Sequence, residues 1–266
     1  MEKKAEPGID RLEDFGRRIL SQCGQQALTY YRGVKPHERF DEGLVTEAEL
    51  DLSARFQEAQ RQAFPAHRMF EGDDCQEGYT HEQKRYLWIF DAIDGLDNFQ
   101  AGIPIWAMSL ALTENYWPLL GMILMPATGD LFQARAGGEA FLGSHPLSMG
   151  AGRAVDEGCL ILTFSRFHRH YRTDFPGKIR NLGCTAAHLC YVAMGRADAA
   201  VVTNESFKDL AAAAVILEAA GGRIFTMGGD PFHVGDHLDG RKITDHLIAT
   251  HPDSLDTILS YLHRLH

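Results

Sequence analysis

Two aspartates three residues apart, Asp91 and Asp94, are the residues of this chain whose type and spacing best predict chemistry. They follow an apolar run over residues 87–90 and come directly before Gly95. Carboxylate oxygens are ligands that Mg²⁺ prefers, and the carbonyl of Ile93 between them faces the same pocket. Gly95 allows close approach of the backbone to a ligand, and the amides after it lie where a helix N-terminus attracts anions. The segment is therefore suited to hold a hard cation beside a phosphate.

An ordinary structural role for the same residues stays open at this point. Aspartates after a strand are common turn and helix-capping residues, and Asp-Gly pairs mark turns. Two further acidic segments favour the metal interpretation. Asp73 and Asp74 follow Gly72 at the end of a short predicted strand, and Asp209 precedes a predicted buried helix. Asp209 also has the spacing of a capping box with Ser206, which would explain it without a metal.

Together these segments resemble the inositol monophosphatase family, the Mg²⁺-dependent, lithium-sensitive phosphomonoesterases. The matching segments, in chain order, are Gly72-Asp73-Asp74, residues 88–99 (W-I-F-D-A-I-D-G-L-D-N-F), residues 102–109, residues 195–199, residues 208–212 (K-D-L-A-A) and residues 218–222 (E-A-A-G-G). The resemblance extends from about Val45 to the C-terminus. It implies a layered αβαβα sandwich of α+β or α/β class, with a metal site at the seam between two halves.

The resemblance also implies roles for individual residues. It implies two or three Mg²⁺ ions that bind a phosphate ester and activate a water molecule. By position it assigns metal ligation to Asp73, Asp91, Ile93, Asp94 and Asp209, catalytic roles to Asp73 and Asp94, and substrate contacts to Gly95 and Leu96. To these we add Asp97 as a candidate catalytic residue, and Thr185 and Lys208 as candidate substrate contacts. The resemblance further implies a homodimer.

Two departures from the family pattern bear on catalysis. Asp73 replaces a glutamate and is one methylene shorter, so we expect it to reach a metal through water. Leu96 replaces the threonine that helps to hold the attacking water, and an isobutyl group cannot form hydrogen bonds. Loss of a water-positioning group is expected to lower the rate by about 10²-fold. Asp97 is a candidate to take over this role, with a solvated turn aspartate as the alternative.

Three other departures concern the substrate and the metal site. Lys208 replaces a tryptophan and is expected to reach either a substrate phosphate or solvent. Val202 stands where inositol-specific members have a glutamate that contacts ring hydroxyls, which favours another small phosphomonoester. Glu49 stands where an aspartate of a mobile loop assists a third metal. The spacing of Thr46 and Glu49 favours a capping box at a helix start instead.

Composition excludes several classes of protein. The chain has 266 residues, 45% of them hydrophobic, which is enough for a large core. A formal charge of −10 argues against nonspecific binding of nucleic acid and makes a metal useful at an anionic substrate site. The five cysteines are scattered and lack C-x-x-C spacing, which is typical of a reducing cytoplasm. The sequence contains no apolar run of about 18 residues, so it predicts no membrane-spanning helix.

The elements that must position these residues follow from hydrophobic periodicity and turn signals. A soft boundary near Gly150 divides the chain into residues 1–150, an N-terminal α+β half with the D-A-I-D-G segment, and residues 151–266, an α/β half with Asp209. The predicted helices cover residues 9–31, 46–63, 185–194, 210–220 and 255–263, and the predicted strands cover residues 68–71, 86–90, 106–114, 119–125, 130–134, 160–164, 199–203, 223–226 and 247–250.

Two hypotheses of different classes follow. The first is Mg²⁺-dependent hydrolysis of a small soluble phosphomonoester, such as an inositol-phosphate-like, sugar, polyol or nucleotide phosphate, by a metal-activated water. Its basis is the set Asp91, Asp94 and Asp209. The second is a binding or scaffold protein on a phosphatase fold that keeps affinity for metal or phosphate ligands without turnover. Its basis is the pair of departures at Leu96 and Asp73.

Overall fold

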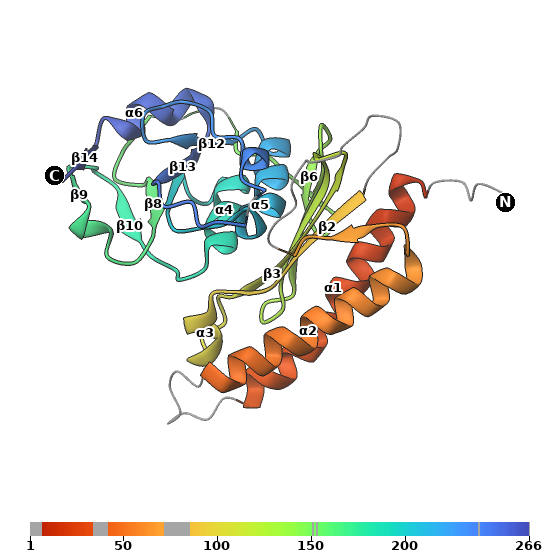
Figure 1. Ribbon diagram of the computed structural model, residues 1–266. Coiled ribbons are helices and arrows are strands. Elements are labelled where there is room, and N and C mark those ends of the chain that lie inside the picture. Colours follow the sequence, from red (N-terminus) through yellow and green to blue (C-terminus); the bar gives the residue numbers. More distant parts are fainter. Residues whose placement is uncertain are drawn as a thin grey trace.

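The computed structural model describes residues 7–33, 42–71, 86–150, 152, 154–238 and 240–265. The predicted acidic segment with Asp73 and Asp74 lies outside the described residues. Two long helices, α1 (Ile9–Gly33) and α2 (Glu42–Ala63), lie side by side across one face of a seven-stranded sheet (Figure 1). The strands of this sheet follow the chain in order: β1 (Arg68–Met69), β2 (Tyr86–Asp94), β3 (Ala107–Glu114), β4 (Trp117–Met125), β5 (Asp130–Arg135), β6 (Ala140–Leu142) and β7 (His145–Leu147).

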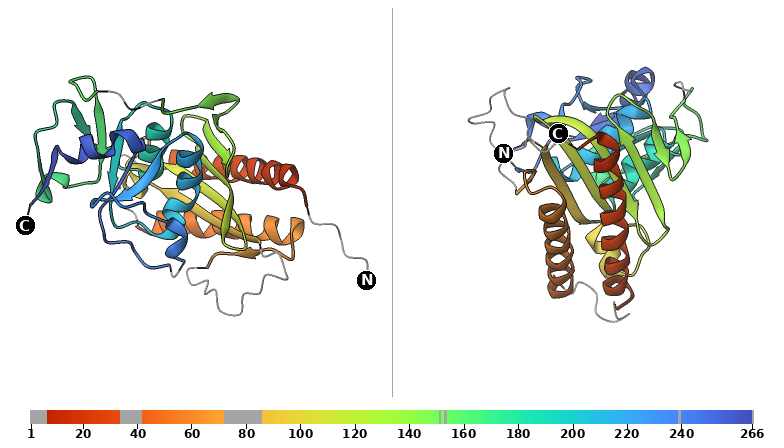
Figure 2. Two further views of the ribbon diagram at one scale, coloured as in Figure 1. Left: turned by 90° about the horizontal axis from the view of Figure 1, so that it is seen from above. Right: turned by 90° about the vertical axis from the view of Figure 1, so that its right-hand side faces the viewer.

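A second sheet of five strands is built from the C-terminal part of the chain. Its order is β10 (Lys178–Arg180), β8 (Leu160–Thr163), β11 (Ala199–Val202), β13 (Leu247–Thr250) and β12 (Arg223–Thr226). Helices α4 (Thr185–Ala193) and α5 (Phe207–Ala219) lie between the two sheets, as the views of Figure 2 show. The short helix α6 (Leu255–Leu259) packs on the outer face of the second sheet. The layer order is therefore αβαβα.

The central strand β2 explains how the layers are held together. Trp88 and Phe90 pack among the aromatic residues of α1 and α2, with the ring of Phe90 stacked on Phe56 at a centroid distance of 4.6 Å. Leu87 and Ile89 point to the opposite face and belong to the core formed with α4 and α5. A strand that is buried on both faces needs apolar residues at every position rather than at alternate ones. This is why the run over residues 87–90 is continuous.

The structure corrects two predicted helices. The second helix begins at Glu42 rather than at Thr46, because the Thr-x-x-Glu spacing also occurs within helices and does not by itself mark a first turn. The terminal helix ends at Leu259 rather than continuing to residue 263. Instead, β14 (Leu262–Arg264) pairs antiparallel with β9 (Tyr171–Thr173), a strand that the sequence did not predict.

The remaining predicted elements are present with ends shifted by a few residues. The strand predicted to end at residue 90 continues to Asp94, and the Ala-rich helix begins at Phe207. Short elements were missed: β6, β7, β10, α3 (Leu96–Gln100) and the 3-10 turns η1 (Phe167–Arg169), η2 (Val234–Asp236) and η3 (Pro252–Ser254). The two sheets fall on either side of Gly150, but the core around α4 and α5 joins both, and the division into two halves stays a prediction.

Two general features of the described residues bear on the environment of the protein. None of the helices within the described ranges is long and apolar enough to cross a membrane. The cysteines that the structure describes, Cys23, Cys159, Cys184 and Cys190, are buried free thiols. The cytoplasmic location expected from the sequence stays a prediction.

A single glycine sets the approach of α5 to the first sheet. A Cβ atom at Gly121 in β4 would lie 2.4 Å from the backbone oxygen of Ala212 in α5. Strand and helix backbones therefore touch directly at this point, which no other residue type allows. Because α5 begins only five residues before Ala212, this contact also fixes the start of the helix, where Lys208 and Asp209 lie.

We predict that Gly121→Ala lowers the free energy of unfolding by about 1–3 kcal/mol, because the added methyl group forces backbone atoms apart. Urea denaturation followed by circular dichroism measures this change. Gly235→Ala is the matched control, since a Cβ at that position meets nothing within 4 Å. Equal stability of the two variants would show that the contact between β4 and α5 is looser than described.

Candidate active site

The first part of the candidate site is the end of β2. Side chains along a strand alternate between the two faces, so Asp91 points to the same face as Leu87 and Ile89. This is the face of the sheet that α5 covers. The pairing of β2 with β3 shifts register between Asp91 and Asp94, and the short helix α3 follows at once. Gly95, at φ 87°, makes the turn, and a Cβ there would lie 3.0 Å from the Cβ of Cys184. A left-handed turn with this little space requires glycine.

The second part is the first turn of α5. The side chain of Asp209 accepts hydrogen bonds from the backbone N–H of Ser206 at 2.7 Å and from its hydroxyl at 2.9 Å. These two residues form the capping box that the sequence predicted. The capping role and a role in the site are compatible, because the bonds from Ser206 use only the Oδ2 atom of Asp209.

The third part is the start of α4, which contacts Asp94. The backbone N–H of Ala186 in the first turn of α4 donates to Oδ2 of Asp94 at 2.5 Å, and the thiol of Cys184 donates to the same oxygen at 3.3 Å. A carboxylate at a helix N-terminus is favourable because it accepts from an otherwise unpaired amide. Burial nevertheless dominates and raises the pKa of Asp94 from 3.8 to about 6.

Two lysines pair with the other two aspartates. The ammonium of Lys208 lies 2.8 Å from Oδ1 of Asp91, and the ammonium of Lys242 lies 3.0 Å from Oδ2 of Asp209. Burial raises the pKa of Asp91, while the charge of Lys208 opposes this change. Burial also disfavours the ammonium of Lys208, but the carboxylate of Asp91 outweighs it and the net pKa of Lys208 is raised. The sequence predicted that Lys208 reaches a substrate phosphate or solvent. In the structure its ammonium contacts Asp91 and its side chain is 37% exposed, and the substrate contact stays a prediction.

Two further carboxylates lie near this group. The charges of Lys208 and Asp91 act on Glu49, and burial raises the pKa of Glu49. The predicted capping role of Glu49 is wrong, because α2 begins seven residues earlier, at Glu42. Glu205 was missed from the sequence, where its place before the capping box gives no signal. It accepts a hydrogen bond from the hydroxyl of Thr185 at 2.7 Å, and burial raises its pKa to about 8.

The other predicted site residues lie close by in the chain but differ in exposure. Ile93 is buried between the two aspartates, whereas Leu96 is 37% exposed and Asp97 is exposed on α3. Thr185 begins α4 and is partly buried. Asp73 lies outside the described residues. The catalytic, metal and substrate roles assigned to these residues stay predictions.

The chemistry of the three aspartates fits a hard cation, but their side chains do not surround a common point in the structure. Asp91, Asp94 and Asp209 offer only oxygen donors, which suit Mg²⁺. Their charges act on one another, since those of Asp91 and Asp209 both raise the pKa of Asp94. Within the described part of the chain, however, no three His, Cys, Asp or Glu side chains form a group that could hold a metal ion. The ammonium groups of Lys208 and Lys242 pair with two of the three aspartates.

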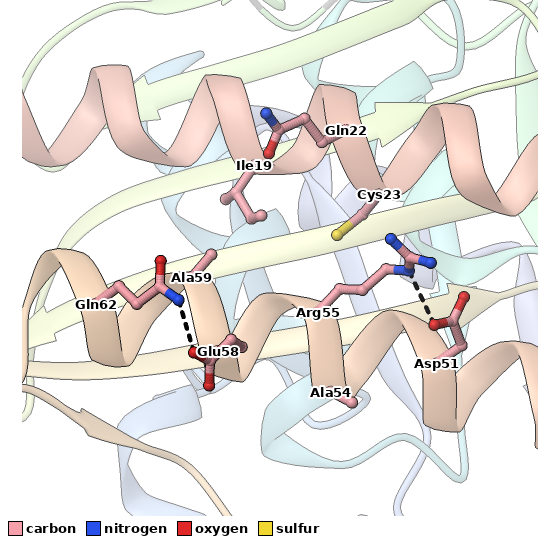
Figure 3. A pocket seen from close by; sticks show the side chains of 9 residues that line it. All are labelled: Ile19, Gln22, Cys23, Asp51, Ala54, Arg55, Glu58, Ala59 and Gln62. Carbon is pink, nitrogen blue, oxygen red and sulfur yellow. Dashed lines mark hydrogen bonds and ion pairs between the residues drawn. The ribbon is translucent and has the colours of Figure 1, made fainter.

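A pocket of about 630 Å³ lies elsewhere, between α1 and α2 (Figure 3). The residues that line it are Ile19, Gln22, Cys23, Asp51, Ala54, Arg55, Glu58, Ala59 and Gln62. Its charged side chains have partners within the lining: Arg55 bonds to Asp51 at 2.8 Å, and Glu58 accepts a hydrogen bond from the amide of Gln62 at 2.6 Å. Burial raises the pKa of Cys23 to about 11, so its thiol stays protonated at neutral pH. The pocket shares no residue with the acidic group.

The layered fold and the acidic seam define the class of phosphomonoesterases that the motifs predicted. The chain belongs to the inositol monophosphatase family, whose model matches residues 10–263. This confirms both the predicted family and the predicted layered α+β fold. The family model spans nearly the whole described molecule, so both sheets and all three helical layers belong to it.

Individual relatives agree with this assignment. The chain is 30% identical over 234 residues to the fructose-1,6-bisphosphatase/inositol-1-monophosphatase of Thermotoga maritima, covering 83% of this chain and 86% of that one. It is 29% identical over 221 residues to a histidinol-phosphatase of Chlorobaculum parvum, covering 79% and 84%. Among solved structures, an IMPase of Thermotoga maritima matches with a TM-score of 0.74 at 26% identity, covering 95% and 96% of the two chains.

We predict that Asp94→Asn stabilises the metal-free protein at neutral pH. Because the pKa of Asp94 is raised from 3.8 to about 6 on folding, its ionised form disfavours the folded state. This cost is absent below about pH 4 and complete above about pH 6, where it amounts to about 2–3 kcal/mol. An asparagine oxygen still accepts from Ala186, so only the charge is removed.

Urea denaturation in EDTA across this pH range measures the difference between the variant and the parent. Asp97→Asn is the matched control, since that side chain is exposed. An Asp94→Asn protein with the same pH dependence as the parent would contradict the prediction.

Proposed function

We propose that this protein hydrolyses a small soluble phosphomonoester with a Mg²⁺-activated water. The single observation that supports the proposal most directly is that Asp91 and Asp94 at the end of β2 and Asp209 in the first turn of α5 are close enough for their charges to act on one another, with Asp94 bonded to the first turn of α4. The relatives that carry the names inositol-1-monophosphatase, histidinol-phosphatase and fructose-1,6-bisphosphatase agree with the enzyme class, phosphoric monoester hydrolase.

In this proposal the carboxylates of Asp91, Asp94 and Asp209, the carbonyl of Ile93 and the carboxylate of Asp73 hold the ions. When bound, Mg²⁺ supplies positive charge to the phosphate and lowers the pKa of a bound water. The family pattern suggests two or three ions. Such ions are useful here because a site with this many carboxylates would otherwise repel an anionic ester.

The chain itself contributes positioning. We assign the backbone amides of Gly95 and Leu96 and the hydroxyl of Thr185 to the binding of substrate oxygens. In the structure the single hydrogen of this hydroxyl is donated to Glu205, so it must turn away from Glu205 to reach a substrate oxygen. The amide of Ala186 and the thiol of Cys184 orient Asp94 by bonding one of its oxygens, which leaves Oδ1 for a ligand. Asp97 is the exposed carboxylate closest in sequence to Leu96 and is our candidate for holding the water.

Several polyol, sugar and nucleotide phosphates fit this proposal better than inositol phosphate itself. The side chain of Val202 in β11 is apolar and buried, so it cannot bond to ring hydroxyls in the way that a glutamate could. The names of two relatives, a histidinol-phosphatase and a fructose-1,6-bisphosphatase/inositol-1-monophosphatase, refer to different substrates. A homodimer in the cytoplasm remains part of the proposal.

We predict that Asp94→Asn reduces Mg²⁺-dependent release of phosphate by at least about 10²-fold, because the variant loses a charged ligand while keeping its hydrogen bond to Ala186. A panel of sugar, polyol and nucleotide phosphates, assayed with and without EDTA, measures the release. Asp256→Asn, on the exposed surface of α6, is the control. An Asp94→Asn protein as active as the parent would exclude the mechanism.

We further predict that Leu96→Thr raises kcat by about tenfold or more, since a hydroxyl at this position can hold the attacking water. The measurement is kcat at saturating Mg²⁺, with circular dichroism to show an unchanged fold. Ile103→Thr is the control, because it also replaces an exposed apolar side chain in the same region. If Leu96→Thr brings no gain, other groups hold the water, and Asp97→Asn then identifies whether that group is Asp97.

A second function is favoured by two observations. Leu96 presents an apolar surface where the family pattern has a hydroxyl, and the ammonium of Lys208 pairs with Asp91, one of the proposed metal ligands. Both fit a protein that binds metal or phosphate ligands without turnover. Calorimetric titration with Mg²⁺ beside the phosphatase assay separates the two functions, because the second requires binding in the absence of turnover.

A further inference from the structure

We propose that Lys208 and Lys242 are built-in counter-cations of the acidic site, which a divalent ion must displace from Asp91 and Asp209 in order to bind. The inference rests on the proposed function, because it concerns the same three aspartates. It adds contacts of two residues that were not predicted as part of the metal site: Lys208, which stands at a tryptophan position of the family pattern, and Lys242, which lies in the loop before β13.

The pair between Lys208 and Asp91 is the stronger of the two. The Asp91 side chain is only 8% exposed, and the 2.8 Å contact gives its charge a partner that water cannot supply. A buried carboxylate without such a partner is strongly unfavourable. Because Lys208 extends from the first turn of α5, the same helix that carries Asp209, the fold holds this cation at the seam between the sheets.

The second ion pair joins Lys242 to Asp209. The ammonium of Lys242 lies on Oδ2 of Asp209, the oxygen that also accepts from Ser206. The Lys242 side chain is 54% exposed, so water and salt screen this pair more than the first. We therefore expect Lys242 to act in the same way as Lys208 but more weakly.

A divalent ion and an ammonium compete here for two reasons. Both need the same carboxylate oxygens, and their like charges repel at short distance. An ion that binds Asp91 must either move the ammonium of Lys208 away or bind beside it against this repulsion. Affinity for the ion is therefore lower than the carboxylates alone would give, and the metal-free protein is correspondingly more stable.

The test compares four variants by calorimetric titration with Mg²⁺ and with Mn²⁺ at about neutral pH. Lys208→Gln is expected to bind the ions with a Kd lowered by about tenfold, Lys242→Gln with a Kd lowered by about threefold, and Lys208→Arg with a Kd near that of the parent because the charge is kept. Lys178→Gln is the matched control, since the ammonium of Lys178 contacts only the carbonyl of Glu157 among the bonds described for it.

Thermal denaturation gives a second measurement that does not depend on activity. In EDTA, Lys208→Gln is expected to lower Tm, because Asp91 loses its partner, and saturating Mg²⁺ is expected to raise Tm more in this variant than in the parent. If Lys208→Gln does not fold, the test uses Lys242→Gln, because loss of a partly exposed ion pair is expected to cost little stability.

The possible results separate this inference from the proposed function. If the parent binds the ions and Lys208→Gln binds them no more tightly, the inference is overturned and the proposed function stands. If neither the parent nor any variant binds either ion, both are overturned. A Lys208→Gln protein that binds inorganic phosphate more weakly with unchanged metal affinity would show that Lys208 is a substrate contact, which also overturns the inference.

Discussion

Burial of negative charge at the seam between two sheets is the constraint on which this structure depends. Asp91 lies on a strand whose neighbours are apolar on both faces, and Asp94 is held by the start of α4. Neither carboxylate can reach bulk water freely, so each needs a partner within the protein. The backbone amide of Ala186 and the ammonium of Lys208 are those partners, and both come from helices that pack between the sheets.

This constraint links the layers to the site. The helix α5 reaches the seam only because its backbone touches β4 at Gly121, and its first turn then delivers Lys208 and Asp209 together. The aromatic packing of α1 and α2 holds the other face of β2 in place. The chain shares its fold with a solved IMPase, and one of its departures from the family pattern, Lys208, lies at the seam itself.

Much of the fold could be predicted from the sequence, because local patterns of apolar and capping residues determine most of its elements. The apolar run before Asp91 indicated a strand buried on both faces, and the spacing of Ser206 and Asp209 predicted the capping box of α5, although the helix begins at Phe207 rather than at residue 210. The errors arose where tertiary contacts outweigh local pattern. The C-terminal segment pairs with β9 instead of continuing a helix, and the signal at Glu49 resembled a helix start although the helix begins at Glu42.

The candidate site was predicted less completely, because its partners are distant in the chain. Spacing identified Asp91, Asp94 and Asp209, but nothing in the sequence indicated that Lys242 contacts Asp209 across 33 residues, or that Glu205 bonds to Thr185. The contact between Lys208 and Asp91 depends on the angle at which α5 meets β2. Such an angle is a property of packing and cannot be read from residue types.

The pairing of Lys208 with Asp91 has a consequence for how a newly synthesised chain reaches its folded state. The counter-charge of the buried carboxylate is a side chain that is covalently present from the start, so the seam can be completed by the polypeptide alone. Under the proposed function, assembly of the fold and capture of a cation would then be separate events.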